Sequence, residues 1–394
     1  MHNLTKIKLF RVVLWITYPI SLIFLYPIVV LKKTKFRLFF FFDRYAIGGA
    51  QRVHLDILES VRDISKKVYF TRFSPNDKLK QEFYLLPGTE CRDIHIWCDY
   101  LIFRIFTVHY YAFLLNRSSG AKVIGANSTF FYDMLPFINK AVFKVELLHN
   151  FTYDKKGMEF FGLINHDYLD KRLAIDNVTR NNILQQYRSY GVNVKYDERV
   201  CLIEFGVEIP VYIEKKHLPP LKILYAGRGS AQKRIWLLNR VVEFFIDTKY
   251  NVLFEFAGSM TDELSVKVRA NSILYGEIGD RALMNSLLRN SHAIILTSSF
   301  EGFPVIIKEA MSYGCVPIVT ALEGNKIHLK HLENSLLIDE PEDEEKVVAN
   351  AIANIQRLSS DQQLLLRLSM EAYNYAARNF RKDEFMIKYR ELLS

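Results

Sequence analysis

The sequence predicts an α/β protein with two domains, each built on a parallel sheet, and a hydrophobic segment before the first domain. Three observations predict this class. Apolar strand-like runs alternate with helix-periodic segments, a pattern that gives parallel sheets covered on both faces. Half of the 394 residues are hydrophobic, which is enough for two cores. A polar, proline-punctuated stretch at 210–220 predicts the interdomain linker.

Residues 12–31 are twenty uncharged and largely apolar residues. At ~1.5 Å per residue, a helix of this length could just cross a hydrocarbon core of ~30 Å. We expect it to contact a membrane, with a buried core helix as the alternative. Pro19 and Pro27 leave open whether it spans the bilayer or lies in it. No small-residue cleavage site follows, so a removed signal peptide is not expected. Basic residues flank the segment: Lys6, Lys8, Arg11, Lys32, Lys33, Lys35 and Arg37.

The positive charge lies in the first third of the chain. Residues 1–120 contain 18 Lys and Arg against 9 Asp and Glu, which accounts for the whole formal net charge of +9. We expect an anionic membrane surface as the partner. Nucleic acid is the alternative from charge alone, but no nucleic-acid-binding signature accompanies it. The four cysteines have no disulfide or metal-ligand spacing, so we expect the cytoplasmic face of a membrane.

The first predicted strand, 36–42, leads into a loop with Gly48 and Gly49 and then a helix over about 50–64. A glycine pair at this turn permits close approach of a ligand to the main chain. The aromatic stretch 94–115 predicts a core-packing helix pair, part of which could instead meet lipid. Further strands are predicted at 122–126, 143–148, 173–175 and 199–203.

The second domain alternates strands and helices. Its first strand, 222–226, ends in a loop that carries Arg228 and Lys233, and a helix over about 235–246 follows. Two cations that flank a strand-to-helix turn can clamp a diphosphate, although either alone is an ordinary surface charge. The remaining strands are predicted at 252–258, 272–275, 293–297, 316–320 and 335–338.

A second such turn follows the strand 293–297. It carries Glu301 and Gly302, and a helix begins at about Pro304. Main-chain N–H groups at a helix start suit a phosphate. Glu309 lies eight positions after Glu301, and we expect the two carboxylates to share nearly one face. The alternative is an ordinary βαβ unit with a solvated glutamate at each end.

Taken together, Gly-Arg-(loop)-Lys and Glu-Gly-Phe-Pro-(four residues)-Glu-Ala-Met resemble the retaining nucleotide-sugar glycosyltransferases of family 4, which have the GT-B fold of two Rossmann-like domains facing a cleft. The resemblance covers roughly residues 36–390. It implies an acceptor domain (36–212), a nucleotide-sugar-binding domain (213–380) and a final helix (381–394) that crosses back, all after the segment 1–35.

The resemblance also implies roles for single residues. Arg228 and Lys233 would bind the donor diphosphate, Glu309 the ribose, and Glu301 and His149 would be the catalytic residues beside the donor sugar. The main chain of Gly302, Phe303 and Pro304 would line the donor pocket, and Gly48 and Gly49 would lie beside the diphosphate. By itself, a histidine at the end of the strand 143–148 is more often structural than catalytic.

The implied reaction transfers a sugar from a nucleotide-diphosphate donor to a lipid-linked or cell-envelope glycan, as in polysaccharide, lipopolysaccharide or capsule biosynthesis. No Asp-x-Asp pair ends a strand, so neither a metal nor another cofactor is expected. The chain departs from the family pattern at Glu204-Phe-Gly-Val-Glu208 and at Glu323-Gly324-Asn325. A non-catalytic membrane-tethered subunit and a sugar-nucleotide epimerase of the same fold are the alternatives.

Overall fold

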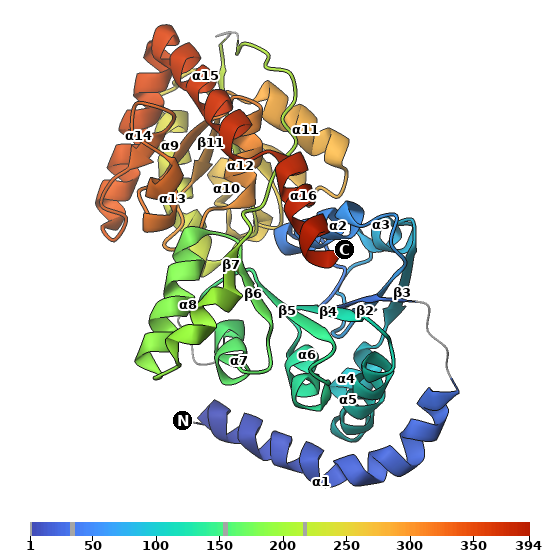
Figure 1. The fold of residues 1–394 in the computed structure, drawn as a ribbon. Helices are drawn as coiled ribbons and strands as arrows, with labels where there is room; N and C mark the ends of the chain where they lie inside the picture. The colour runs from blue at the N-terminus through green and yellow to red at the C-terminus, as the bar shows by residue number, and fades with distance from the viewer. Residues whose placement is uncertain (1, 32–35, 153–156, 216–218) are drawn as a thin grey trace. The chain divides into compact units, whose positions relative to one another are not determined.

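The computed structural model describes residues 2–31, 36–152, 157–215 and 219–394 (Figure 1). Three of the four basic residues after the hydrophobic segment, Lys32, Lys33 and Lys35, therefore lie outside the described residues. The chain divides into two compact units. Unit 1 comprises Met1–Glu204 and Met386–Ser394, and unit 2 comprises Phe205–Phe385.

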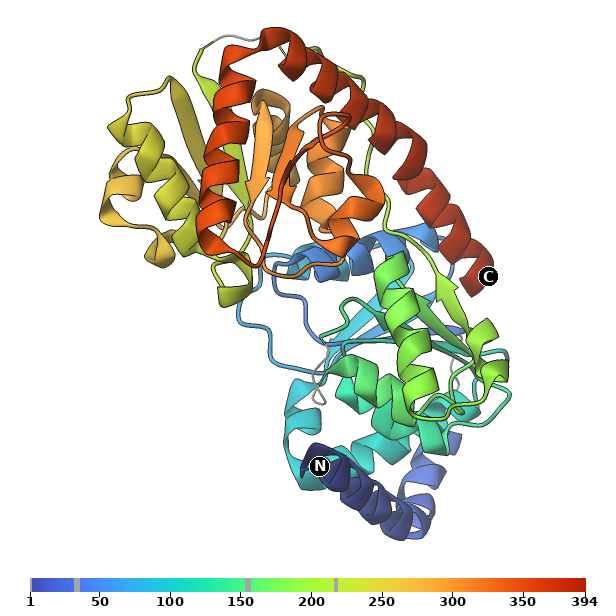
Figure 2. The same ribbon diagram turned by 90° about the vertical axis from the view of Figure 1, so that its left-hand side faces the viewer.

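Unit 1 is built on a seven-stranded parallel sheet in the order β3-β2-β1-β4-β5-β6-β7. The sheet is covered by helices on both faces (Figures 1 and 2). All five residues of β1 are buried, as expected for a central strand of a parallel sheet. The strands are β1 (Leu38–Phe42), β2 (Lys66–Phe70), β3 (Thr89–Asp93), β4 (Lys122–Ala126), β5 (Phe143–Leu148), β6 (Lys171–Ala174) and β7 (Val200–Leu202). The helices are α1 (His2–Val30), α2 (Gly49–Ser60), α3 (Lys80–Tyr84), α4 (His95–Asp99), α5 (Leu101–Asn116), α6 (Thr129–Met134), α7 (Met158–Ile164) and α8 (Asn177–Ser189), with 3-10 turns η1 (Leu135–Phe137) and η2 (Val194–Arg199).

Unit 2 is built on a six-stranded parallel sheet in the order β10-β9-β8-β11-β12-β13. Its strands are β8 (Leu221–Ala226), β9 (Val252–Ala257), β10 (Ile273–Gly276), β11 (Ala293–Leu296), β12 (Val316–Thr320) and β13 (Leu336–Ile338). Its helices are α9 (Ile235–Asp247), α10 (Val266–Ala270), α11 (Arg281–Asn290), α12 (Val305–Ser312), α13 (Glu323–His328), α14 (Glu344–Ser360) and α15 (Gln362–Asn379), with 3-10 turns η3 (Ala231–Lys233) and η4 (Thr261–Glu263). The last helix, α16 (Lys382–Leu393), begins in unit 2 and ends in unit 1.

The fold class predicted from the sequence is confirmed: two parallel α/β sheets, preceded by an apolar helix. The predicted strands 122–126, 143–148 and 316–320 have the bounds of β4, β5 and β12, and the helix pair in 94–115 is α4 and α5. The sequence analysis missed β2 and β3. It also extended the first helix to residue 64, whereas α2 ends at Ser60. The Nζ of Lys66 donates to the carbonyls of Val61 and Ile64, which follow the helix (2.9 and 3.2 Å).

Helix α1 packs along unit 1 and lies beside α5 (Figure 1). Leu14 and Val29 belong to the same buried cluster as residues of α5 and β1. In the described part of the chain, Thr5–Val30 is the one stretch long and apolar enough to cross a membrane by length and composition, and 17% of its apolar window is buried.

Candidate functional site

The two turns singled out in the sequence meet at the carboxyl edge of the unit 2 sheet. β8 and β11 are neighbours although β9 and β10 lie between them in the sequence, so the strand order reverses here. Open α/β sheets bind ligands outside the carboxyl ends of the strands at such a reversal. Arg228 and Lys233 follow β8, and Glu301 and Gly302 follow β11.

Hydrogen bonds join the two turns. The N–H of Ser299 donates to the carbonyl of Gln232 (2.9 Å), and the Nε2 of Gln232 donates to the carbonyl of Phe300 (2.8 Å). The hydroxyl of Thr297 donates to the carbonyl of Lys233 (3.0 Å). The turns therefore hold their side chains in one fixed arrangement.

Arg234 strengthens this junction. Its backbone is left-handed (φ 49°) and its side chain is buried. The guanidinium donates to the carbonyls of Thr297 (2.7 Å), Ser298 (3.0 Å) and Pro341 (2.6 Å). Five donors on a rigid plane allow arginine to satisfy three carbonyls at once.

The ammonium group of Lys233 forms an ion pair with a carboxylate oxygen of Glu301. The side chains are 17% and 12% exposed, so water shields this pair only in part. The lysine of the predicted diphosphate clamp therefore contacts the predicted catalytic carboxylate directly.

Tyr225 links Arg228 to this pair. Its buried hydroxyl donates to the carbonyl of Arg228 (3.0 Å). Burial raises the pKa of Tyr225, the carboxylates of Glu301 and Glu263 raise it further, and the Arg228 guanidinium opposes them. Charges of both signs, from Arg228 and Glu301, therefore lie near one phenol, and the Arg228 side chain is exposed to solvent.

A third turn, after β12, packs against Gly302. A Cβ atom on Gly324 would lie 1.8 Å from the carbonyl oxygen of Gly302, so only glycine fits there. The next residue, Asn325, is buried and donates to the carbonyl of Thr320 (2.8 Å). In the described part of the chain, Asn325 Oδ1 and the hydroxyl of Ser298 are buried without a hydrogen-bond partner.

Helix α12 begins at Val305, so Glu301 lies four residues before it and Glu309 lies inside it. The helical repeat therefore does not relate the two side chains, and the expectation that both carboxylates share nearly one face stays a prediction. Glu309 is half-buried, and its carboxylate contributes to the raised pKa of Tyr313, for which burial is the main cause. The side chain of Phe303 is buried against His328, with ring centroids 4.5 Å apart.

In unit 1, Gly48 and Gly49 lie where β1 turns into α2. A Cβ atom on Gly49 would meet no atom within 4 Å, and one on Gly48 would meet the end of the Gln51 side chain at 2.5 Å. Packing therefore does not demand glycine at position 49. The predicted close approach of a ligand stays a prediction.

His149 follows β5, as the sequence analysis placed it, and its Nε2 lies 2.8 Å from the Nε2 of His54. His54 stacks on Phe42, with ring centroids 3.9 Å apart. Burial lowers the pKa of His149 to about 4. It also lowers the pKa of His54 strongly, and His149 adds to that shift. Both rings are therefore neutral near pH 7 and share one proton between the two Nε2 atoms.

Comparison with known proteins gives the class. Residues 212–375 match the family model "Glycosyl transferases group 1". Over 163 residues the chain is 27% identical to the lipopolysaccharide 1,6-galactosyltransferase of Salmonella typhimurium (strain LT2). That alignment covers 39% of this chain and 43% of the relative, so it spans less than half of the relative's length.

Solved structures show the same fold along nearly the whole chain. TarM superposes with a TM-score of 0.70 at 13% identity, covering 92% of this chain and 99% of its own. Anabaena HepE in complex with UDP-glucose superposes with a TM-score of 0.70 at 15% identity, covering 90% of this chain and 99% of its own. The apo form of the lipopolysaccharide outer core galactosyltransferase WaaB superposes with a TM-score of 0.64 at 20% identity, covering 90% of this chain and 98% of its own. The match to the glycosyl transferases group 1 lies within unit 2, and the fold of the chain is GT-B.

Sequence reasoning found the residues that carry charge and missed those that position them: Arg234, Tyr225, Gly324 and His54. The signal for His54 was present, because it lies three and four positions before Ile57 and Leu58 on the buried face of α2. Arg234 follows Lys233 directly, and the sequence gives no means to tell which of the two cations is buried.

Proposed function

We propose that this protein transfers a sugar from a nucleotide-diphosphate donor to a lipid-linked or cell-envelope glycan, with retention of anomeric configuration and without a metal ion. The observation that carries the proposal is the cluster of Arg228, Lys233 and Glu301 at the strand-order reversal of unit 2. The cluster lies inside the region that matches the family model. Donor binding in 213–380 and acceptor binding in 36–212 are part of the proposal.

In this proposal Arg228 and Lys233 hold the donor diphosphate. Positive groups fixed in advance stabilise the negative charge that develops on the leaving diphosphate. Because Lys233 is paired with Glu301, the diphosphate competes with that carboxylate for the ammonium group. Glu301 is then free to orient the sugar, Glu309 binds the ribose, and the main chain of 302–304 lines the pocket.

The role proposed for His149 is to donate a hydrogen bond to a sugar hydroxyl from Nδ1. The proton between the two Nε2 atoms can be bonded to His54 or to His149. His54 Nδ1 is buried without a hydrogen-bond partner among the described residues, and a buried N–H without an acceptor is rarer than an unused acceptor. We therefore assign the shared proton to His54, which leaves His149 protonated at Nδ1.

Relatives guide the choice of substrate. HepE is solved with UDP and glucose, and the Salmonella relative is named for lipopolysaccharide. We propose a UDP-sugar as donor and an acceptor glycan of the lipopolysaccharide type. The enzyme would work at the cytoplasmic face of the membrane, which residues 12–31 contact. Nucleic acid is not proposed as a partner.

The first test is isothermal titration with UDP-, GDP-, ADP- and CDP-sugars. We expect UDP-sugars to bind and the Arg228→Ala/Lys233→Ala variant to lose binding at least a hundredfold. Arg240→Ala is the matched control, because Arg240 is a cation of the neighbouring helix α9 that pairs with Glu345 instead. Equal affinity of the double variant and the control would refute the proposed donor site.

The second test separates an enzyme from a non-catalytic subunit. Radiolabelled UDP-sugar is incubated with the protein and a lipid extract from membranes, and label in the lipid fraction is counted. We expect transfer by the wild type and loss of transfer in Glu301→Gln. Donor binding without transfer to any envelope extract would favour the non-catalytic subunit.

A further inference from the structure

Helix α1 presents a narrow inward face to unit 1. Leu14, Ser21 and Val29 are fully buried, and Phe10 and Leu25 pack against the same cluster. These positions recur at intervals of four or seven residues, so they form one stripe along the helix. The stripe runs from Phe10 to Val29, and unit 1 therefore holds the helix along most of its length.

Polar contacts fix this inward face. Ser21 Oγ lies 2.7 Å from His109 Nδ1, and both side chains are fully buried. Near the start of the helix, a guanidinium nitrogen of Arg11 donates to Asn165 Oδ1 (2.6 Å). A helix that left unit 1 to span a bilayer would break both contacts and remove Ser21 as the hydrogen-bond partner of His109.

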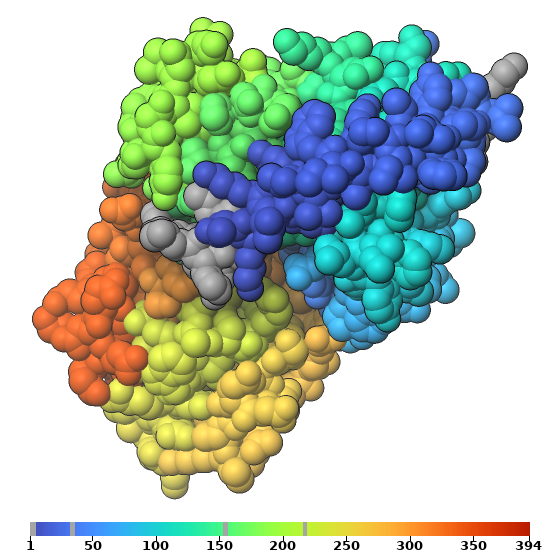
Figure 3. Space-filling model, turned by 90° about the horizontal axis from the view of Figure 1, so that it is seen from below, coloured from blue at the N-terminus to red at the C-terminus, as the bar shows by residue number. Residues whose placement is uncertain are grey.

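The outward face of α1 is apolar and exposed. Its largest side chains include Ile16 (67% exposed), Ile23 (69%) and Phe24 (67%). The neighbouring helices add Trp97 and Ile102, so the exposed apolar area continues from α1 onto α4 and α5. Figure 3 views this face, with α1 in dark blue across the surface and the cyan α4–α5 segment beside it. An apolar patch this long marks a surface that something covers.

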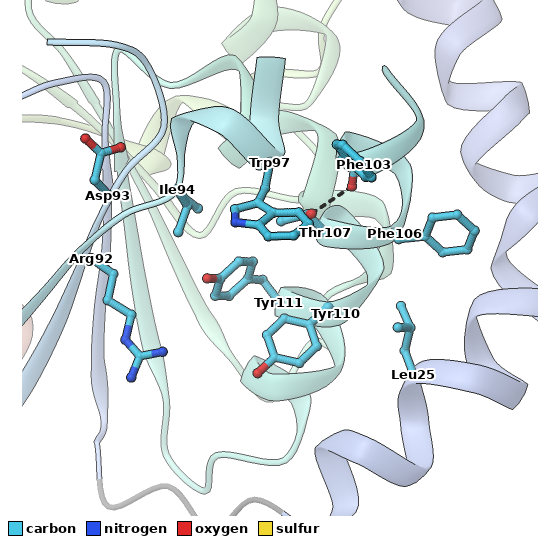
Figure 4. Close-up of a pocket in the computed structure, with 10 residues that line it drawn as sticks. All are labelled: Leu25, Arg92, Asp93, Ile94, Trp97, Phe103, Phe106, Thr107, Tyr110 and Tyr111. Atoms are coloured by element: carbon cyan, nitrogen blue, oxygen red, sulfur yellow. Dashed lines mark hydrogen bonds between the residues drawn. The ribbon is translucent and has the colours of Figure 1, made fainter. Parts of the chain in front are cut away.

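A cavity of about 510 Å³ lies where α1 and α5 meet the end of β3 (Figure 4). Its walls include Leu25 of α1, Phe106 and Tyr110 of α5, and Trp97 of α4. Arg92 lies at the side away from α1 and pairs with Glu90. The exposed apolar face thus extends into a hollow with mostly apolar and aromatic walls.

We infer that α1 lies in the plane of an anionic membrane leaflet, held by unit 1 on its inward side, while its outward face and that of α4 and α5 enter the acyl chains. The inference deepens the proposed function and rests on it for membrane contact. In this inference α1 does not span the membrane but lies between unit 1 on one side and lipid on the other. Such a helix has no charged face, and residues 12–30 of α1 carry no charged side chain, whereas an interfacial helix exposed to water on one side needs a polar face.

The distribution of charge favours lipid, rather than a protein partner, as what covers the exposed apolar face. Residues 12–31 carry no charged side chain, whereas the exposed Lys6 and Lys8 lie just before them. Residues 1–120 carry an excess of nine positive charges. Basic groups beside an uncharged apolar face match anionic head groups above acyl chains.

The face is tested by co-flotation of the full-length protein with sealed vesicles of phosphatidylcholine, with or without 30 mol% phosphatidylglycerol. We expect stronger binding to the anionic vesicles, and at least a tenfold loss for Ile16→Asn/Ile23→Asn. Val211→Asn/Val266→Asn is the matched control, because these exposed apolar residues belong to unit 2. Equal binding of both double variants would overturn the proposed face.

The orientation is tested on the bound protein with a protease-cleavable tag before residue 1. A helix in the plane keeps its N-terminus on the same side as the rest of the protein, so we expect complete cleavage without detergent. Protection of the tag until detergent is added would show a spanning helix and overturn the inference. If vesicles are not bound and Ile16→Asn/Ile23→Asn instead converts a dimer to a monomer, a second protein copy covers the face. Titration of these variants with UDP distinguishes either failure from failure of the donor site.

Discussion

At the scale of single residues, the ion pair between Lys233 and Glu301 couples the two charges of the candidate site. Each charge partly neutralises the other. A change in one side chain therefore alters what the other can bind.

Glu301→Gln is expected to bind UDP more tightly while losing turnover. The substitution keeps the shape of the side chain and releases Lys233 to the diphosphate. A partly shielded pair is worth about 1 kcal/mol, which corresponds to roughly fivefold in affinity. Titration of UDP against the wild type and the variant measures the change. Weaker binding of UDP to the variant would contradict the assignment of Lys233 to the diphosphate.

Gly324→Ala is expected to destabilise unit 2 by about 1–3 kcal/mol, because the added methyl group would overlap the carbonyl of Gly302. Urea unfolding followed by Trp236, the tryptophan of unit 2, measures the loss. Gly49→Ala is the control, since a Cβ atom there meets no neighbour within 4 Å. Similar stability of Gly324→Ala and wild type would show that the third turn can move away from Gly302.

The charged residues of the candidate site could be read from the sequence because their turns follow recognisable strands. Their partners could not be read in the same way. That Glu301 pairs with Lys233, and His149 with His54, depends on contacts across 68 and 95 positions of the chain. Only the order of strands in the sheets brings these side chains together.

At the scale of elements, the turns after β8 and β11 act as one piece because Arg234 of the first donates to Thr297 and Ser298 of the second. The candidate cations and the candidate carboxylate lie on different turns. Their geometry therefore depends on a residue that the proposal does not place in contact with the donor.

Arg234→Lys is expected to weaken UDP binding at least tenfold and to destabilise unit 2 by about 2–4 kcal/mol. A lysine has one ammonium group and cannot reproduce the planar fork that serves three carbonyls. Titration with UDP and urea unfolding give the two values. Arg240→Lys, on the helix α9 that follows Arg234 and paired with Glu345, is the control. Unchanged UDP affinity would show that the turns keep their geometry without the guanidinium.

The strands missed by sequence reasoning share a physical cause. β3 is the edge strand of its sheet, and its sequence Thr-Glu-Cys-Arg-Asp lacks the apolar pattern of a buried strand because it is only partly covered. β2 begins with two lysines, of which Lys66 is buried by bonding to carbonyls. The predicted strands β4 and β12 are buried along nearly their whole length and are mostly apolar, whereas Lys144 and Glu146 interrupt the apolar residues of β5.

At the scale of the whole molecule, burial lowers the pKa of four histidines among the described residues, so that their rings are neutral near pH 7. His54, His109 and His149 belong to unit 1, and His328 belongs to unit 2. Burial lowers the pKa of His109, His149 and His328 to about 4, and it lowers that of His54 strongly. Unfolded histidine titrates near pH ~6.5, so the unfolded chain binds more protons than the folded chain between these values.

We therefore expect the free energy of unfolding to be highest above pH ~6.5 and to fall as the pH drops toward 4, by up to ~1.4 kcal/mol per pH unit for each buried histidine. Burial raises the pKa of Asp43 and Asp133, which gives the opposite slope at the acid end of this range. Urea unfolding at pH 7, 6 and 5 measures the effect, with Trp15 and Trp97 reporting on unit 1. The slope of the unfolding free energy with pH counts the protons that unit 1 takes up when it unfolds. His109→Gln should lower that number by about one, whereas His331→Gln, at an exposed histidine, should leave the slope unchanged. A wild-type slope that persists in His109→Gln would show that His109 reaches its proton without unfolding, and that α1 does not seal the ring from water.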